Sequence, residues 1–332
     1  MESNKRYAFI FSACFFILLL SAFLALSLGA MRLGLPELIY GILSKEASIP
    51  GRILLYVRFP RLLAAVLAGA GLSASGVLIQ TVLANPLASP GIIGVNAGAG
   101  LAAAICMAFL PGMVMLLPLA AFFGALTAVL LVYFIARGTG ASRITLVLSG
   151  VTISSLMTAG INTLITTHPD IMGTLRDFQN GGFTGVSLRG LLPAGAVILS
   201  GLLIAFYFAG ELDILGLGES TAASLGLNVR FYRFLFLGLA AALAGAAVSF
   251  AGLLGFVGLI VPHMARLLLR GAQKRKLLVL SALMGAVFLI LCDTAARTIF
   301  SPFELPVGIL IAYLGAPFFL WLLYKDRRRR YD

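Results

Sequence analysis

The sequence predicts an all-α, polytopic integral membrane protein with about ten transmembrane helices and both termini in the cytoplasm. Hydrophobic residues fill 61% of the 332 positions and charged residues 11%, whereas an ordinary soluble domain carries about 25% charged residues. No Asp, Glu, Lys or Arg lies between Arg61 and Arg137, a stretch with room for three crossings of roughly 20 residues each. The apolar runs are long and unbroken. Membrane-spanning strands would instead give short alternating segments, so helices are expected.

Ten apolar runs, separated by turn-forming or charged residues, are the expected crossings. The dipeptides Asn85-Pro86, Pro90-Gly91 and Pro111-Gly112 divide the long uncharged stretch. The first run follows Lys5 and Arg6 and is too long for the core of a signal peptide, so we expect it to be a retained crossing. The ten runs are Tyr7–Leu28, Leu62–Leu83, Ile92–Leu110, Met113–Ala136, Ile144–Thr166, Leu191–Phe208, Phe231–Gly252, Leu253–Leu269, Leu277–Ala296 and Pro306–Tyr324.

The region 231–269 leaves the number of crossings open, because it is long for one helix and tight for two, and Pro262 interrupts it. The positive-inside rule favours two. With ten crossings, sixteen Lys and Arg residues face the cytoplasm and eight face outward. The polar, Gly-rich stretch 170–189 is interpreted as a loop. The net charge of +12 is attributed to these orientation signals, so nucleic acid is not an expected partner.

Neither a metal site nor a cofactor is expected from the sequence. The three cysteines, Cys14, Cys106 and Cys292, lie far apart in separate apolar runs. The two histidines, His168 and His263, have no neighbours in the sequence that would complete a metal site. The chain also has no G-x-x-x-x-G-K-[ST] phosphate loop. We therefore do not expect an enzyme, and ATP-driven transport would require hydrolysis on a separate ATPase subunit.

Four groups of residues, spread from the second crossing to the last, resemble one known family in their order and spacing. That family is the FecCD-type permeases, the membrane subunits of ATP-binding-cassette (ABC) importers for ferric siderophores, haem and cobalamin. The first group is Arg58-Phe59-Pro60-Arg61, Gly69–Gly76, Gln80, Asn85–Pro90 and Gly94; the second is Leu217–Ser220 and Ala222–Gly226; the third is Gly255–His263 with Ala265-Arg266; the fourth is Asp293-Thr294, Ala296-Arg297, Glu304–Gly308 and Gly315–Phe319.

The resemblance implies an assembly as well as a function. Residues 1–332 would form a single transmembrane permease domain in the bacterial cytoplasmic membrane. It would pair with a second permease, identical or paralogous, and with two cytoplasmic ABC ATPases. An extracytoplasmic substrate-binding protein would deliver the cargo. A ferric siderophore is the first expectation for that cargo, with cobalamin and haem as alternatives.

The segment 211–228 lies between two crossings on the expected cytoplasmic side. Glu219 and Ser220 are expected to cap a short helix of small residues that fits a groove in a partner. The resemblance makes this segment the ATPase-coupling helix; the alternative is an ordinary loop helix. The coupling residues are Gly218, Glu219, Ser220, Ala222, Ala223, Leu225 and Gly226.

Arg58, Arg61 and Arg297 fall at the outer ends of expected crossings. Since arginine pairs directionally with carboxylates, the resemblance suggests that they dock the binding protein. The alternative is that they anchor helix ends at lipid headgroups. Asp293, four residues before Arg297, is the one carboxylate well inside an expected crossing. A local pair with Arg297 is preferred to a role in proton coupling.

Asn85 and Leu87, with Ala141 and Ser142, are expected at the inner ends of crossings. By resemblance they would narrow the pathway as a cytoplasmic gate, and the family more often has a hydroxyl residue where Ala141 stands. The alternative is that Asn85-Pro86 only forms a turn.

Three other functions remain open at this stage. An ion-driven secondary transporter would need titratable groups near the bilayer midplane, and Asp293 is the candidate. A membrane serine protease would use Ser75 and His263, but the sequence indicates no base or oxyanion geometry. A purely structural membrane protein would not explain the Gly- and Pro-rich interruptions.

Overall fold

The computed structural model describes residues 2–29, 31, 33–44, 48–138, 143–301 and 303–328. The expected gate residues Ala141 and Ser142 lie outside these ranges. Within them every regular element is a helix: α1 (Glu2–Ser27), α2 (Leu35–Ser44), α3 (Ile49–Ile53), η2 (Leu54–Arg58), α4 (Phe59–Val82), η3 (Pro90–Ile93), α5 (Val95–Phe109), η4 (Val114–Leu116), α6 (Leu117–Gly138), α7 (Arg143–Thr167), η5 (Pro169–Ile171), α8 (Met172–Asn180), α9 (Leu188–Tyr207), α10 (Ala209–Gly216), α11 (Glu219–Ser224), α12 (Val229–Ala251), α13 (Val257–Leu269), α14 (Lys274–Thr298) and α15 (Val307–Arg328). The predicted all-α class is confirmed.

Seven helical stretches in the described chain are long and apolar enough to cross a membrane. Three shorter apolar stretches, α5, α13 and residues Val307–Leu322 of α15, fall where the sequence predicts the remaining crossings. The total of ten crossings stays a prediction, because α13 has 13 residues and is about 20 Å long, against a hydrocarbon core of about 30 Å.

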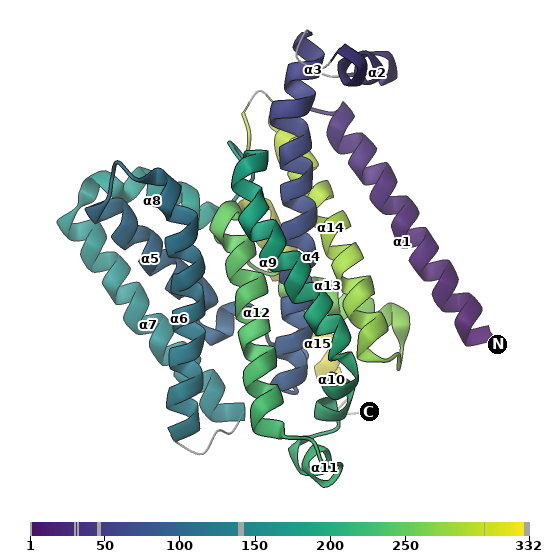
Figure 1. Ribbon diagram of the computed structural model, residues 1–332, viewed down its shortest axis with the longest axis vertical. Coiled ribbons are helices and arrows are strands. Elements are labelled where there is room, and N and C mark those ends of the chain that lie inside the picture. Colours follow the sequence, from purple (N-terminus) through teal and green to yellow (C-terminus); the bar gives the residue numbers. More distant parts are fainter. Residues whose placement is uncertain are drawn as a thin grey trace.

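A central bundle contains α4, with α12, α13 and α14 packed against it. Figure 1 shows α5, α6 and α7 on one side of this bundle and α1 on the other. In the helical stretch 49–82, which includes α4, 72% of the most apolar window is buried inside the protein, whereas in α1 the buried share is 11%. Since both stretches are strongly apolar, α4 lies in the protein interior, whereas α1 leaves most of its apolar surface exposed at the edge of the bundle.

Glycines allow the central helices to approach closely. A Cβ added at Gly69 would collide with the backbone of Gly285 on α14, and one at Gly76 with the backbone of Gly258 on α13. Such contacts between small residues hold membrane helices together, because apolar side chains gain little by leaving lipid for protein.

Two details of the predicted arrangement are wrong. The stretch 170–189, interpreted as a loop, contains α8, whose Leu175 is buried against α5 and α7. Residues 253–256, placed inside a crossing, are not helical. Their backbone is instead held by a neighbour, since the Leu253 amide donates to Phe178 O at 2.9 Å. Irregular backbone at membrane depth is tolerated where protein supplies such partners.

The two ends of the bundle differ. Figure 1 shows α2, α3 and α8 at one end and α11 at the other, and α1 begins in the half of the molecule nearer α11. The stretch 49–82 has 34 residues, about 51 Å as a helix, so it extends beyond a 30 Å core. We call these the α3 end and the α11 end.

Candidate functional site

The helix α11 is short, tightly bounded and exposed. It begins after Gly218 and ends before Gly226, whose φ angles of 111° and 83° favour glycine. At its C-terminus the amide of Leu227 donates to Ala222 O at 3.0 Å, and that of Gly226 to Ala223 O at 2.9 Å. This pair of bonds is a Schellman motif, which ends a helix sharply.

The predicted coupling residues all lie on or beside α11. Ala222 is buried, whereas Ser220, Ala223, Leu225 and Gly226 are exposed, with Leu225 61% accessible. The predicted cap is wrong, because Gly218 is the N-cap and makes no side-chain capping bond. The Glu219 side chain is directed elsewhere, so the helix is fixed by glycines at its ends and by an ion-pair network.

The Glu219 carboxylate joins α11 to two membrane helices. It pairs with Arg143, the first residue of α7, at 3.6 Å, and with Arg233 in the first turns of α12. The Arg233 side chain is 6% exposed and that of Glu219 42%. The Glu219 carboxylate therefore links α11 to α7 and to α12 through charged contacts.

Hydroxyl and amide side chains line one exposed face of α7. Gly91 and Ile92 of η3, with α7, enclose a groove of about 510 Å³. Thr152, Ser155 and Thr158 each donate to the carbonyl four residues earlier at 2.8–3.0 Å, so their oxygens are left to face outward as acceptors. The α7 residues along the groove are Val151, Ser154, Ser155, Thr158, Ala159 and Asn162.

This α7 groove is not among the features expected from the sequence, although the sequence contains a signal for it. Polar residues recur at 152, 155, 158, 162 and 166, a three-to-four residue spacing that places them on one helix face. On a membrane helix such a face avoids lipid and meets water or another protein chain. After Arg143, α7 carries no charged residue.

The three arginines predicted to dock a binding protein lie at the α3 end, and all are buried. Arg58, Arg61 and Arg297 are 4%, 6% and 7% exposed. The Arg58 guanidinium donates to Leu26 O and Met31 O, and Arg297 donates to Ala25 O at 3.0 Å. These bonds connect η2 and α14 to the end of α1, and docking through these arginines stays a prediction.

Asp293 is the centre of this cluster. Its Oδ2 lies 3.3 Å from Arg297 Nε, which confirms the predicted local pair. Its Oδ1 also accepts from Arg61 Nε at 2.9 Å, a contact across 232 residues that the sequence analysis did not anticipate. Arg61 also donates to Glu304 at 2.8 Å. The carboxylate is thus held between two guanidinium groups, as in a structural ion pair.

Arg61 and Glu304 also line a hollow of about 400 Å³ with Asp177 and the residues around Gly181. A partner that docks at this end would reach Arg61 through this hollow. It would have to compete with Glu304, whose side chain is 42% exposed.

Asn85, from the predicted gate, is exposed just beyond α4. Its Oδ1 accepts from the Leu87 amide at 2.9 Å, which is the bond of an Asx turn. The structure therefore contains the turn that was the alternative explanation, and the gate role stays a prediction.

Ser75, the residue considered as a protease nucleophile, is fully buried and donates to Ala240 O at 2.7 Å. This bond connects α4 to α12 and gives the hydroxyl a structural role. In the part of the chain that the structure describes, no three His, Cys, Asp or Glu side chains are grouped as metal ligands.

Comparison with known proteins agrees with this geometry. The model of the FecCD transport family matches residues 17–325. The Fe(3+)-citrate import permease YfmE of Bacillus subtilis is 36% identical over 95% of this chain and 94% of its own. The hemin transport permease HmuU of Yersinia pestis is 37% identical over 95% and 96%. A solved metal-chelate type ABC transporter in an inward-facing conformation superposes with a TM-score of 0.85, at 29% identity over 96% and 99% of the two chains.

The fold and these matches define the class of protein, a transport permease that is the membrane subunit of an ABC transporter. The chain belongs to the FecCD transport family. It is accordingly a multi-pass protein of the cytoplasmic membrane.

Proposed function

We propose that this chain imports a ferric chelate of the siderophore class. In this proposal two permeases, identical or paralogous, place their α7 grooves around a common pathway. An extracytoplasmic binding protein delivers the chelate at the α3 end. Two ATPases act on α11 from the cytoplasm, the side on which both termini lie.

The link from α11 to α7 through Glu219 and Arg143 carries this proposal. ATP binding and hydrolysis in the ATPases move α11, whose exposed Leu225 and small residues offer a contact surface. The contact at 3.6 Å passes that movement to the start of α7. Since α7 lines the groove, the pathway changes shape when α11 moves, which is what alternating access requires.

The hydroxyl and amide side chains of the groove support a cargo that carries polar groups. Hydroxyl groups that already donate their hydrogen bond to a backbone carbonyl can still accept hydrogen bonds from water or cargo through their oxygens. They provide no ion pair that would retain the cargo. Cobalamin, which is rich in amides, fits the same surface.

Uptake measurements separate these cargoes. Cells lacking the gene, with and without a complementing copy, would be given radiolabelled iron on a panel of ferric siderophores and citrate, and labelled haem and cobalamin. ATP would be depleted while the proton gradient is maintained. We expect ATP-dependent uptake of one ferric chelate class. Uptake of only haem or cobalamin would refute the assignment of a ferric chelate as the cargo. Uptake that survives ATP depletion would favour an ion-driven transporter.

A further inference from the structure

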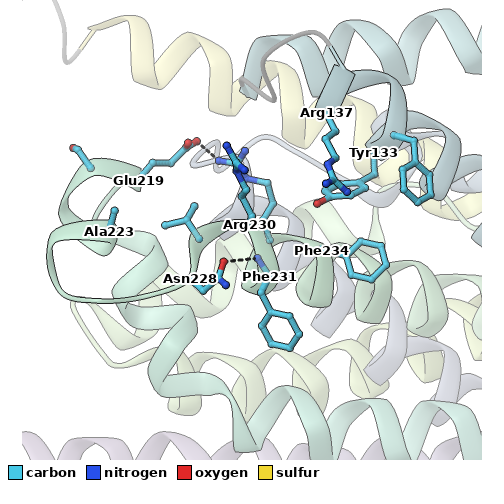
Figure 2. A pocket seen from close by; sticks show the side chains of 12 residues that line it. Tyr133, Arg137, Glu219, Ala223, Asn228, Arg230, Phe231 and Phe234 are labelled. Carbon is cyan, nitrogen blue, oxygen red and sulfur yellow. Dashed lines mark hydrogen bonds and ion pairs between the residues drawn. The ribbon is translucent and has the colours of Figure 1, made fainter.

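A hollow of about 920 Å³ lies beside α11, where α6 ends and α12 begins. Figure 2 shows Arg137 of α6 on one side of the hollow and Glu219 of α11 on the other, with Arg230 of α12 between them. The hollow is therefore at the α11 end of the bundle, where membrane helices emerge from the bilayer.

The charge of the hollow is predominantly positive. Arg137, Arg230 and Arg233 line it, with Glu219 as the one carboxylate among the lining residues. That carboxylate is already paired with Arg233 and with Arg143. Within the described ranges, Arg137 and Arg230 are exposed and take part in no ion pair. Two guanidinium groups are thus available for an anion, and guanidinium binds phosphate oxygens in a bidentate manner.

The hollow is also continuous with a surface suited to lipid chains. Phe134, which lines it, is 55% exposed. Leu119, Phe123 and Leu131 are 49%, 58% and 42% exposed and lie on the same face of α6, within about 120° of one another around the helix. The face runs about 22 Å along α6, enough for acyl chains in one leaflet of about 15 Å. Phe231 and Phe234 of α12, also exposed, line the hollow as well.

We propose that this hollow binds the headgroup of an anionic phospholipid, with the phosphate at Arg137 and Arg230 and the acyl chains along α6. Basic pockets between membrane helices are suited to such headgroups. An acidic segment of a partner protein would match the arginines but not the apolar face that continues into the bilayer. The predicted coupling residues Ser220 and Ala223 also line the hollow, so a lipid bound there and an ATPase on α11 would be neighbours. The inference depends on the chain crossing a membrane and not on the cargo.

Bound lipid would contact the elements that hold α11. The phosphate, held by Arg137 and Arg230, would lie beside the ion pair of Glu219 with Arg233, because these four charged side chains line the same hollow. Lipid composition would then influence how firmly α11 is held against α12.

Binding to the purified full-length chain tests the proposal. The delipidated protein would receive phosphatidylglycerol, phosphatidylcholine or inorganic phosphate. Bound lipid would be counted by native mass spectrometry and the melting temperature recorded. We expect saturable binding of phosphatidylglycerol with a raised melting temperature, little effect of phosphatidylcholine, and weak binding of phosphate alone. Equal binding of both lipids, or an equal effect of phosphate, would overturn the assignment to an anionic lipid.

The double variant Arg137→Gln with Arg230→Gln locates the site. Each arginine near a membrane surface contributes about fivefold in affinity, which corresponds to ~1 kcal/mol, so the pair should weaken phosphatidylglycerol binding about 25-fold. The matched control is Arg176→Gln with Arg189→Gln, two exposed arginines on α8 and at the start of α9. Equal weakening by the control would reveal general charge attraction. Unchanged lipid binding in the Arg137 and Arg230 variant, with loss of a co-purified ATPase, would make the hollow a protein-docking surface. Either result would refute the proposal.

Discussion

Replacing Glu219 by Gln tests whether movement of α11 is coupled to transport through the ion pairs of Glu219. Glutamine keeps the shape of the side chain and removes its charge. In the structure that charge holds Arg233 of α12 and Arg143 of α7. We expect ATP hydrolysis to continue in the variant complex while its link to transport weakens.

The size of the effect follows from the two contacts. The pair with Arg233 has one side chain at 6% exposure, and a hydrogen bond to a charged group contributes about 1.5–3 kcal/mol. The pair with Arg143 is longer, with side chains 36% and 42% exposed, and contributes at most about 1 kcal/mol. A coupling free energy of about 2 kcal/mol corresponds to roughly a 30-fold change.

The assay is ATP hydrolysis and substrate uptake by the complete complex in proteoliposomes, with and without loaded binding protein. Glu219→Gln should lower the number of cargo molecules imported per ATP by roughly 30-fold, the change that about 2 kcal/mol of coupling free energy corresponds to. The control is Glu211→Gln, the same chemical change on α10, where the described residues provide no ion pair.

The reasoning would be refuted if Glu219→Gln imported as much cargo per ATP as the parent complex while Arg143→Gln did so too. If Glu219 acts through Arg143, the double variant Glu219→Gln with Arg143→Gln should import as much cargo per ATP as Glu219→Gln alone. The reason is that both changes break the same contact.

Three further predictions concern other parts of the structure. Asp293→Asn should destabilise the protein by about 3 kcal/mol, since Arg61 and Arg297 would lose a buried carboxylate. The melting temperature of the variant measures this loss. Normal stability with lost uptake would support ion coupling instead. Gly258→Val should lower the melting temperature by the equivalent of about 1–3 kcal/mol, because a Cβ would lie 2.8 Å from Leu72 O. An unchanged melting temperature would show that α13 does not pack this closely against α4. Asn162→Leu should reduce uptake severalfold at unchanged stability, because it removes the one amide side chain among the described residues that line the α7 groove. Normal uptake would place the pathway elsewhere.

The structure also changes how the outer arginines can be tested. Reversing the charge of Arg58 and Arg61 is the direct test of whether these side chains dock the binding protein. Both side chains are buried, and Arg61 pairs with Asp293, so a carboxylate at either position would be buried against carbonyl or carboxylate oxygens. Glu304→Gln is the milder test. If docking uses Arg61, this change should strengthen it by removing a competitor.

The amino-acid sequence by itself determined the helical membrane class, the approximate positions of the crossings and the family. Hydrophobic length is a local property, since about 20 apolar residues span a bilayer whatever surrounds them. The α11 segment and the pair of Asp293 with Arg297 were also local, because glycines delimit the helix and four residues separate the pair.

Only the tertiary structure decided which side chains meet across the chain. Arg61 reaches Asp293 over 232 residues, and Glu219 joins α7 to α12. Ionic contacts of this kind depend on how helices are placed beside one another, and no spacing in the sequence encodes that placement. For the same reason the sequence presented Arg58, Arg61 and Arg297 as available groups, although packing of α1 and α14 buries them.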